Sequence, residues 1–370
     1  MPTLTGTLRI AAISCRVAVL IVCVGCSVDS AEGPASDTRS GTSLLAVGDT
    51  GSVWGALPGL FEGQLAVGAA MQREHERDPV DTLVLLGDNF YPSGLLAHEF
   101  RHRVVQNVVR PYCGFVEVTA ELEDLVGRLC SGARTPARRI LAIIGNHDLL
   151  APESVDLQRK EIPRLVRNWD MPLEDGPVVR ELPGGLSLIL LVSEWPWDET
   201  PSRRLADALE EAKGPWRVIV GHRPPIAGHP QLSHMIERAS RDSDRVVHAY
   251  LAGHVHGLAA IRGVAPAPLL TLIAGSGSHP KLQEEPEYRI EGADVMVEEL
   301  GFLRMDAIAA PAPPRLRITL SMARPSAALA IFGTTTLARY EIGLDGTVER
   351  VDGDVTTGRP WRPDAPIDRP

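Results

Sequence analysis

Five short apolar runs in this 370-residue chain each end in a glycine that is followed by an aspartate, an asparagine or a histidine. Continuous apolar runs of this length are typical of strands buried on both faces, and a glycine lets the backbone turn sharply where the strand ends. In an open α/β sheet, ligands bind beyond the carboxyl ends of the strands, so we expect the turns to meet at one edge. The turns are Gly48-Asp49, Gly87-Asp88, Gly145-Asn146, Gly221-His222 and Gly253-His254.

One such turn carries little information, because Asp and Asn are common turn residues. Five in series, with three histidines in the last two (His222, His254 and His256), indicate a metal site built from strand ends.

Strand-like runs alternate with stretches of helical spacing along most of the chain. Strands are expected at 44–47, 82–86, 140–144, 186–192, 218–220, 246–251 and 269–273, and helices at 60–77, 95–109 and 203–213. This alternation indicates a layered α/β fold, and a hydrophobic content of 44% is enough for a sizeable core.

The expected domain spans residues 43–345. Within it, the charged stretch 114–139 has no strand signal and is interpreted as an insertion over the core. A proline-rich break at 309–314 precedes two candidate antiparallel strands, 315–322 and 337–344. Residues 346–370, polar and proline-rich from Gly353, are expected to be a loose tail.

The first 26 residues have the features of a secretory signal: two arginines, an apolar run too short to span a bilayer, and small residues after it. We therefore expect an exported protein, periplasmic or on the cell surface. Cys26 resembles the lipidated cysteine of a bacterial lipoprotein, although Cys23 stands where leucine is usual. A lipid anchor at Cys26, ordinary cleavage and an uncleaved anchor all stay open, with 27–42 as a tether.

Two cysteines, Cys113 and Cys130, remain for the folded part. In an oxidising compartment they are expected to pair, the alternative being two buried thiols. The formal net charge of −10 argues against a nucleic-acid partner. It does not argue against a small anionic substrate, because bound metal ions can dominate the local charge.

The five turns have the residues and the order of the calcineurin-like metallophosphoesterases, and the resemblance covers residues 44 to about 275. Gly51 stands where most members have a histidine, two residues after the first aspartate. Tyr91 stands where purple acid phosphatases supply a tyrosinate, and residues 87–91 (GDNFY) resemble the small, mammalian-type members of that branch. The resemblance implies a four-layer α/β/β/α fold, in which two sheets pack face to face between helices.

The resemblance also implies a pair of metal ions held by seven residues. Asp49, Tyr91 and His256 would bind Fe(III); Asn146, His222 and His254 would bind a divalent iron, zinc or manganese ion; Asp88 would bridge both. Carboxylate and phenolate are hard donors suited to a trivalent ion, while imidazole and amide suit a divalent one.

Three further residues are candidates for catalysis by the same resemblance. His147 matches a histidine that faces the phosphate and helps the leaving oxygen take a proton. Asp148 is expected to orient His147, or else to cap the turn. His229 is the candidate for a second histidine on the substrate side, with His234 as the alternative.

The other histidines and the tryptophans have structural interpretations, or a structural and a functional one side by side. His75, His98 and His102 are expected at the surface, and His248 packed within a strand. The glycine-rich loop before His279 is a weak candidate for a phosphate contact, and Trp195 and Trp197 either rim the pocket or pack under a loop.

The expected function is that of an acid phosphatase, which cleaves small phosphate monoesters through a hydroxide held by the two ions. A metal-dependent phosphodiesterase has the same ligands and is the alternative. A non-catalytic surface binding protein is a more remote alternative, because all seven ligand positions are filled.

Overall fold

We describe the protein from a computed structural model, which places residues 41–51, 63–130, 134–174, 176–194, 199–226, 228–278, 290, 292–309, 313–326 and 331–352. All of these lie in one compact unit, residues 39–370. The expected signal, Cys26 and most of the expected tether lie outside the described residues. None of the helices in the described segments is both long enough and apolar enough to cross a bilayer.

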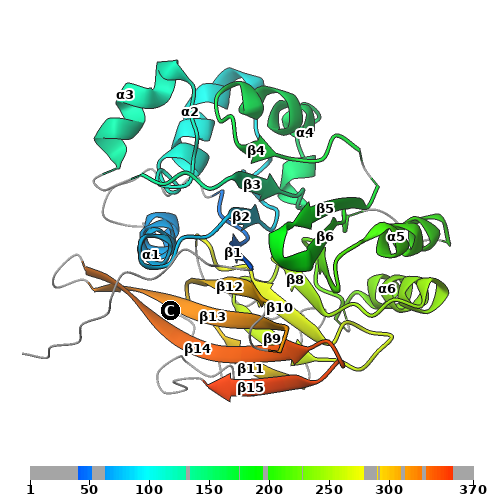
Figure 1. The fold of residues 1–370 in the computed structure, drawn as a ribbon. Coiled ribbons are helices and arrows are strands. Elements are labelled where there is room, and N and C mark those ends of the chain that lie inside the picture. Colours follow the sequence, from blue (N-terminus) through cyan, green and yellow to red (C-terminus); the bar gives the residue numbers. More distant parts are fainter. Residues whose placement is uncertain are drawn as a thin grey trace, which may run out of the picture. The chain divides into compact units, whose positions relative to one another are not determined.

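The described strands form two sheets (Figure 1). The first has the order β15 (Val348–Asp352), β14 (Ile331–Gly343), β13 (Arg315–Ser326), β12 (Gly301–Ile308), β1 (Thr42–Val47), β2 (Thr82–Leu85), β3 (Arg139–Ala142) and β4 (Trp169–Asp170). The second has the order β11 (Ala293–Val297), β9 (Leu258–Arg262), β10 (Leu270–Ala274), β8 (Ala249–Ala252), β7 (Trp216–Val220), β6 (Leu186–Leu190) and β5 (Val178–Leu182). The neighbouring strands β1 to β4 in the first sheet and β10-β8-β7-β6 in the second are parallel, and the remaining pairs are antiparallel.

Helices flank both sheets (Figure 1). Those on the side of the first sheet are α1 (Gly63–Arg77), α2 (Phe100–Val104), α3 (Ala120–Leu129) and α4 (Ser154–Asp156), and those beside the second are α5 (Glu199–Glu211) and α6 (Pro230–Ser243). Short 3-10 or π turns lie at Ala97–Glu99, Val105–Val109, His147–Leu149, Leu157–Glu161, Ile162–Arg164 and Pro183–Gly185. The expected helix over 95–109 is therefore a series of short helical pieces.

Successive side chains of strands such as β1 and β7 point to opposite faces of the sheet, and both faces are buried, which explains why these sequences are apolar throughout. In β1, Leu44 and Ala46 pack in a core shared by the two sheets, whereas Leu45 and Val47 pack in a second core that contains residues of α1. Strand β7 does the same, because Val218 and Val220 belong to the shared core and Ile219 packs with α5 and α6. Each central strand is buried on both faces. The layers run helix, sheet, sheet, helix, which confirms the expected four-layer fold.

One boundary differs from expectation. The antiparallel pair β13–β14 is confirmed, but the stretch expected as a loose tail contains β15, which pairs with β14. Val348 packs against the core shared by the sheets, and this burial holds the short edge strand. Residues from 353 onward lie outside the described part.

The stretch 114–139 is part of the core rather than an insertion over it. It contains α3, and its apolar residues Phe115, Val118, Leu122 and Val126 are fully or almost fully buried with the outer face of the first sheet. Cys113 and Cys130 form a disulfide with a Cα–Cα distance of 5.8 Å, which closes a loop around α3. The expected pairing is confirmed.

His75 and His248, which lie away from the strand-end turns, are both buried. His75 was expected at the surface, but it lies inside, where its Nε2 is 2.6 Å from the Thr135 carbonyl and its Nδ1 accepts a hydrogen bond from the Val80 amide. His248 is packed as expected, one residue before β8, against the ring of Trp216.

Replacing both Cys113 and Cys130 by serine is expected to lower the free energy of unfolding by about 3 kcal/mol. The bridge spans a sequence separation of 17 residues, and closing a loop of that size restricts the unfolded chain by about this amount. Urea unfolding of the oxidised protein, the reduced protein and the double variant measures the effect. Equal midpoints for all three would contradict the prediction.

His248 should make the protein less stable as the pH falls from about 6.5 to about 4. Burial, with the charge of Arg217 adding to it, lowers the pKa of His248 from 6.5 to about 4. Above pH 6.5 the imidazole is neutral in both states, whereas within this window only the unfolded chain takes up the proton, at about 1.4 kcal/mol per pH unit.

The test compares urea unfolding of the wild type with that of His248→Asn at several pH values. Asparagine keeps an acceptor for the Arg217 amide, which donates to His248 Nδ1 at 3.1 Å. The variant should lack this part of the acid-induced loss. Parallel pH profiles for the two proteins would show that His248 does not cause it.

Candidate metal centre

Three of the strand-end residues have a positive φ angle, a backbone conformation that residues other than glycine rarely adopt. Asp49 (φ 58°) follows β1, Asp88 (φ 52°) follows β2 and His254 (φ 67°) follows β8. A positive φ is uncommon for residues other than glycine, and such strain persists where the surrounding structure imposes it, often at functional sites. Here it turns short side chains inward from the sheet edge.

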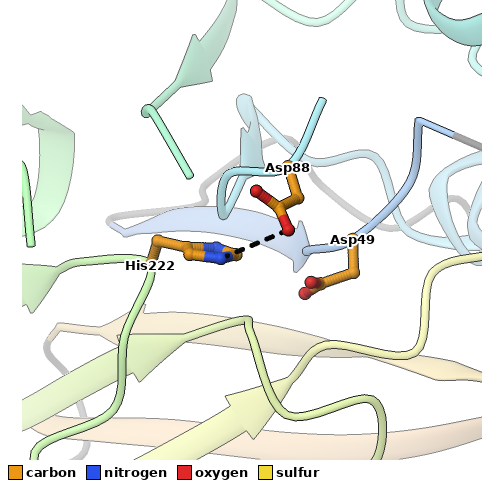
Figure 2. Close-up of side chains that lie close together, drawn as sticks. All are labelled: Asp49, Asp88 and His222. Carbon is orange, nitrogen blue, oxygen red and sulfur yellow. Dashed lines mark ion pairs between the residues drawn. The ribbon is translucent and has the colours of Figure 1, made fainter. Parts of the chain in front are cut away.

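Asp49, Asp88 and His222 converge although they come from different sheets (Figure 2). One ligand atom from each lies within 4.8 Å of the other two, and all three side chains are buried. His222 Nε2 is 3.5 Å from Asp88 Oδ2, the ion pair drawn in Figure 2. Carboxylate oxygens and imidazole nitrogens at this spacing are suitable ligands for a metal ion.

Tyr91 joins this cluster through its hydroxyl group. The hydroxyl oxygen lies 2.8 Å from Asp49 Oδ1, 2.8 Å from Asp88 Oδ2 and 3.1 Å from His256 Nε2. His256 Nε2 is itself 3.3 Å from Asp49 Oδ1. The four residues expected around the first ion, with Asp88 as the bridge, are therefore together.

The residues expected around the second ion lie next to this first cluster. Asn146 Oδ1 is 3.2 Å from His222 Nε2, and the ring centroids of His222 and His254 are 5.1 Å apart. His222 Nδ1 lies 2.8 Å from the Leu86 carbonyl oxygen and must donate its proton there. In the neutral ring, that hydrogen bond leaves the lone pair on Nε2, the nitrogen that faces Asn146 and Asp88.

The charges of this cluster favour a cation. Burial, together with the carboxylates of Asp49 and Asp88, raises the pKa of the Tyr91 hydroxyl well above its ordinary value. Burial alone would lower the pKa of His222, but Asp88 outweighs it and raises that pKa to about 10. Buried anionic groups this close need a compensating positive charge. A phenol, carboxylates, an amide and imidazoles are also the donor types that the expected pair of ions requires, so the residues fit it.

Gly51 explains how a tyrosine reaches this place. The Gly51 amide donates to the Asp88 carbonyl at 3.2 Å, and the Tyr91 amide donates to the Gly51 carbonyl at 2.8 Å. A Cβ atom at Gly51 would lie 2.1 Å from the Asn89 carbonyl oxygen, closer than any real contact. The two turns are too close for a side chain at position 51, and that approach brings Tyr91 between the carboxylates.

His147 lies beside Tyr91, with ring centroids 4.4 Å apart. Its amide donates to Asp88 Oδ1 at 2.9 Å, and its ring Nδ1 is 2.5 Å from the Pro92 carbonyl oxygen. The carbonyl holds the proton on Nδ1 and so fixes the tautomer. His147 is partly exposed, as a residue that meets a substrate has to be.

Asp148 does not have the expected partner, and its predicted role of orienting His147 is corrected. The carboxylate is fully buried and accepts hydrogen bonds from the amides of Asn89, Phe90 and Gly145 and from the Gln158 side chain. Burial, and then the charge of Asp88, raise its pKa to about 7. Asp148 caps the turns that present Asp88 and Asn146, which is the alternative that the sequence left open.

His229 is buried immediately before α6, with its ring centroid 5.7 Å from that of His254. His229 therefore lies beside a residue that is expected to bind the second ion. The alternative, His234, is exposed on α6. Trp195, Trp197 and His279 lie outside the described residues.

Two arginines at the site were missed by the sequence analysis. Arg103 is buried, and its Nη2 donates to the carbonyls of Gly51 (3.1 Å) and Tyr91 (2.7 Å), which fastens the two turns together. Arg223 contacts His254 and Glu194. Nothing in the helical pattern around Arg103 marks it as buried, whereas the position of Arg223 directly after His222 was a usable signal.

The sequence profile of the calcineurin-like phosphoesterases matches residues 42–258, more than half of the chain. The chain belongs to this family. Its members use metal ions to hydrolyse phosphoesters, and the cluster of Asp49, Asp88 and His222 lies within the matched region.

Solved structures show the same fold at low sequence identity. The GAP50 anchor of the inner membrane complex of Plasmodium is 12% identical, with a TM-score of 0.55 over 86% of this chain and 91% of that one. Purple acid phosphatase PPD1 from yellow lupin is 13% identical, with a TM-score of 0.50 over 80% and 54%. PhoD is 11% identical, with a TM-score of 0.52 over 86% and 73%. No curated protein has a significantly similar sequence.

Gly51→Ala should disrupt the cluster, because the added methyl group would overlap the Asn89 carbonyl. We expect a loss of about 1–3 kcal/mol in the free energy of unfolding, together with weaker metal binding. Gly127→Ala is the matched control, since that glycine is exposed in α3 with no atom near its Cβ position, and it should gain about 1 kcal/mol. Equal metal content and stability in the Gly51 variant and the wild type would contradict the prediction.

Proposed function

We propose that this protein is a phosphoester hydrolase that uses two metal ions and cleaves small phosphate monoesters, as an acid phosphatase does. The observation that carries the proposal is the position of the Tyr91 hydroxyl, 2.8 Å from each of two buried carboxylates that follow neighbouring parallel strands. Within a family that otherwise has a histidine where Gly51 stands, this geometry supports the purple acid phosphatase branch.

The proposed first ion is Fe(III), held by Asp49, Tyr91 and His256, and the second is a divalent iron, zinc or manganese ion. Asn146, His222 and His254 would hold the second ion, and Asp88 would bridge the two. When bound, two such ions supply charge that stabilises a phosphoryl group and lowers the pKa of a water molecule.

The protein side chains supply orientation and proton transfer. The Leu86 carbonyl orients His222 and the Pro92 carbonyl orients His147, so that each ring, when neutral, has one defined unprotonated nitrogen. Once protonated, His147 is the group placed to give a proton to the leaving oxygen. His229, beside His254, is the second histidine proposed to face the substrate.

The fold alone does not establish catalysis, because one of the similar structures is described as an anchor. The proposal therefore depends on the ligand residues, all seven of which lie in the described part of the chain. Export of the protein through the 1–26 signal, and attachment to a membrane surface by a lipid on Cys26, are proposed from the sequence alone.

The purified full-length chain should release nitrophenol from nitrophenyl phosphate, most rapidly at acidic pH. Asp88→Asn keeps the shape of the bridge but removes a negative charge, so activity should fall at least about 100-fold. Asp345→Asn, a change in the exposed turn between β14 and β15, is the matched control and should leave the rate unchanged.

The matching diester, bis-nitrophenyl phosphate, is assayed in parallel. Cleavage of the diester alone would assign the site to a phosphodiesterase. No cleavage of either ester by protein with two bound ions would reject the general phosphatase and favour a binding role.

A further inference from the structure

The guanidinium group of Arg223 lies between a buried carboxylate and one of the expected metal ligands. Its Nε donates to Glu194 Oε2 at 2.7 Å, and its Nη1 lies 2.9 Å from His254 Nε2. The Glu194 side chain is 5% exposed, and that of Arg223 is 23% exposed. His254 therefore has a cationic neighbour within hydrogen-bond distance of its ring.

The chemistry of this contact defines the state of His254. A guanidinium group has only donors, so the Nε2 atom of His254 must accept the hydrogen bond with its lone pair. A neutral imidazole then carries its proton on Nδ1.

That state is incompatible with a metal ion on His254. If the ion binds Nε2, it needs the lone pair and the place that Arg223 Nη1 occupies. If the ion binds Nδ1, the ring proton has to move to Nε2, where it would point at another donor. In both cases the hydrogen bond from Arg223 must break before His254 can bind an ion.

Hydrogen bonds hold the backbone of Arg223 in place, so only its side chain can move when an ion binds His254. The Arg223 amide donates to Ser193 Oγ at 2.7 Å, and its carbonyl accepts a hydrogen bond from the Tyr250 hydroxyl at 2.8 Å. The charged pair with Glu194 gives the guanidinium a partner that it can keep after leaving His254.

We propose that Arg223 competes with the second metal ion for His254. In the metal-free protein, Arg223 holds the His254 ring in place and neutralises Glu194. Binding of the ion releases the contact with His254 and leaves the guanidinium with Glu194. Arg223 is thus a positioning residue that lowers the affinity of the second ion relative to the first. This inference rests on the proposed function only in assuming that His254 is a ligand.

The test is a calorimetric titration of the metal-free, full-length protein with Zn²⁺, which resolves a first and a second binding step. Arg223→Met removes the donor, and Arg223→Lys keeps the positive charge. A lysine ammonium is a compact point charge and should stay with Glu194 rather than reach His254 as well. Both variants are expected to bind the second Zn²⁺ at least tenfold more tightly, with the first step unchanged. Arg238→Met, a change at an exposed residue of α6, is the control and should match the wild type.

Two results would overturn the proposal. Unchanged affinity in both variants would show that Arg223 does not compete, while tighter binding in Arg223→Met alone would reduce its effect to a general repulsion between charges. Failure of all the proteins to bind a second Zn²⁺ would reject the two-ion site itself and this inference with it, whatever the phosphatase assay shows.

A second readout follows the ring of His254 directly. Nitrogen-15 NMR of the metal-free protein should show an unprotonated Nε2 in the wild type, with a chemical shift that changes on addition of Zn²⁺ and in Arg223→Met. A His254 signal that is the same in the wild type and in Arg223→Met would also overturn the proposal.

Discussion

The close approach of the turns after β1 and β2 is the constraint on which the site depends. The parallel pairing of these strands continues beyond their ends, because the Asp49 amide donates to the Gly87 carbonyl and the Gly51 amide donates to the Asp88 carbonyl. These bonds bring two aspartates side by side in a strained conformation and leave no room for a side chain at position 51. Tyr91 then lies where both carboxylates meet. Two side chains hold this arrangement: Arg103 donates to the carbonyls of Gly51 and Tyr91, and Asp148 accepts hydrogen bonds from the amides of Asn89 and Phe90.

The second sheet supplies the histidines of the candidate metal centre. They reach the aspartates only because the two sheets lie close together at this edge. His222, His254 and His256 follow strands of the second sheet, whereas Asp49, Asp88 and Asn146 follow strands of the first. The two sheets come together at this edge through glycines, since a Cβ atom at Gly48 would lie 3.0 Å from Gly253 Cα. The apolar core between the sheets therefore sets the spacing of the candidate ligands, although it contributes none of them.

Buried charges at the candidate metal centre and in the groups around it are compensated by neighbouring cations and hydrogen-bond donors. Carboxylates and a phenol buried together are costly unless cations or donors neutralise them. His222 neutralises Asp88, while backbone amides solvate Asp148. Arg223 neutralises Glu194 and contacts His254 at the same time, and on this double contact rests the proposal that it opposes a second ion. The fold is shared with an anchor and with a purple acid phosphatase, so the fold alone does not define what the residues at this edge do.

The amino-acid sequence determined the layers and marked the candidate ligands, because both depend on local pattern. Strands such as β1 and β7 are apolar throughout, and the residue after each glycine at a strand end is defined by chain order alone. The position of Tyr91 after Asp88, with Gly51 in place of a histidine, already indicated the branch of the family. Sequence patterns could not assign partners across the fold. Tertiary structure decided that Asp148 binds amides rather than His147, that β15 is an edge strand, and that His75 is buried. It also placed Arg223 on His254, because an arginine's partner depends on which residues folding brings within the reach of its long side chain.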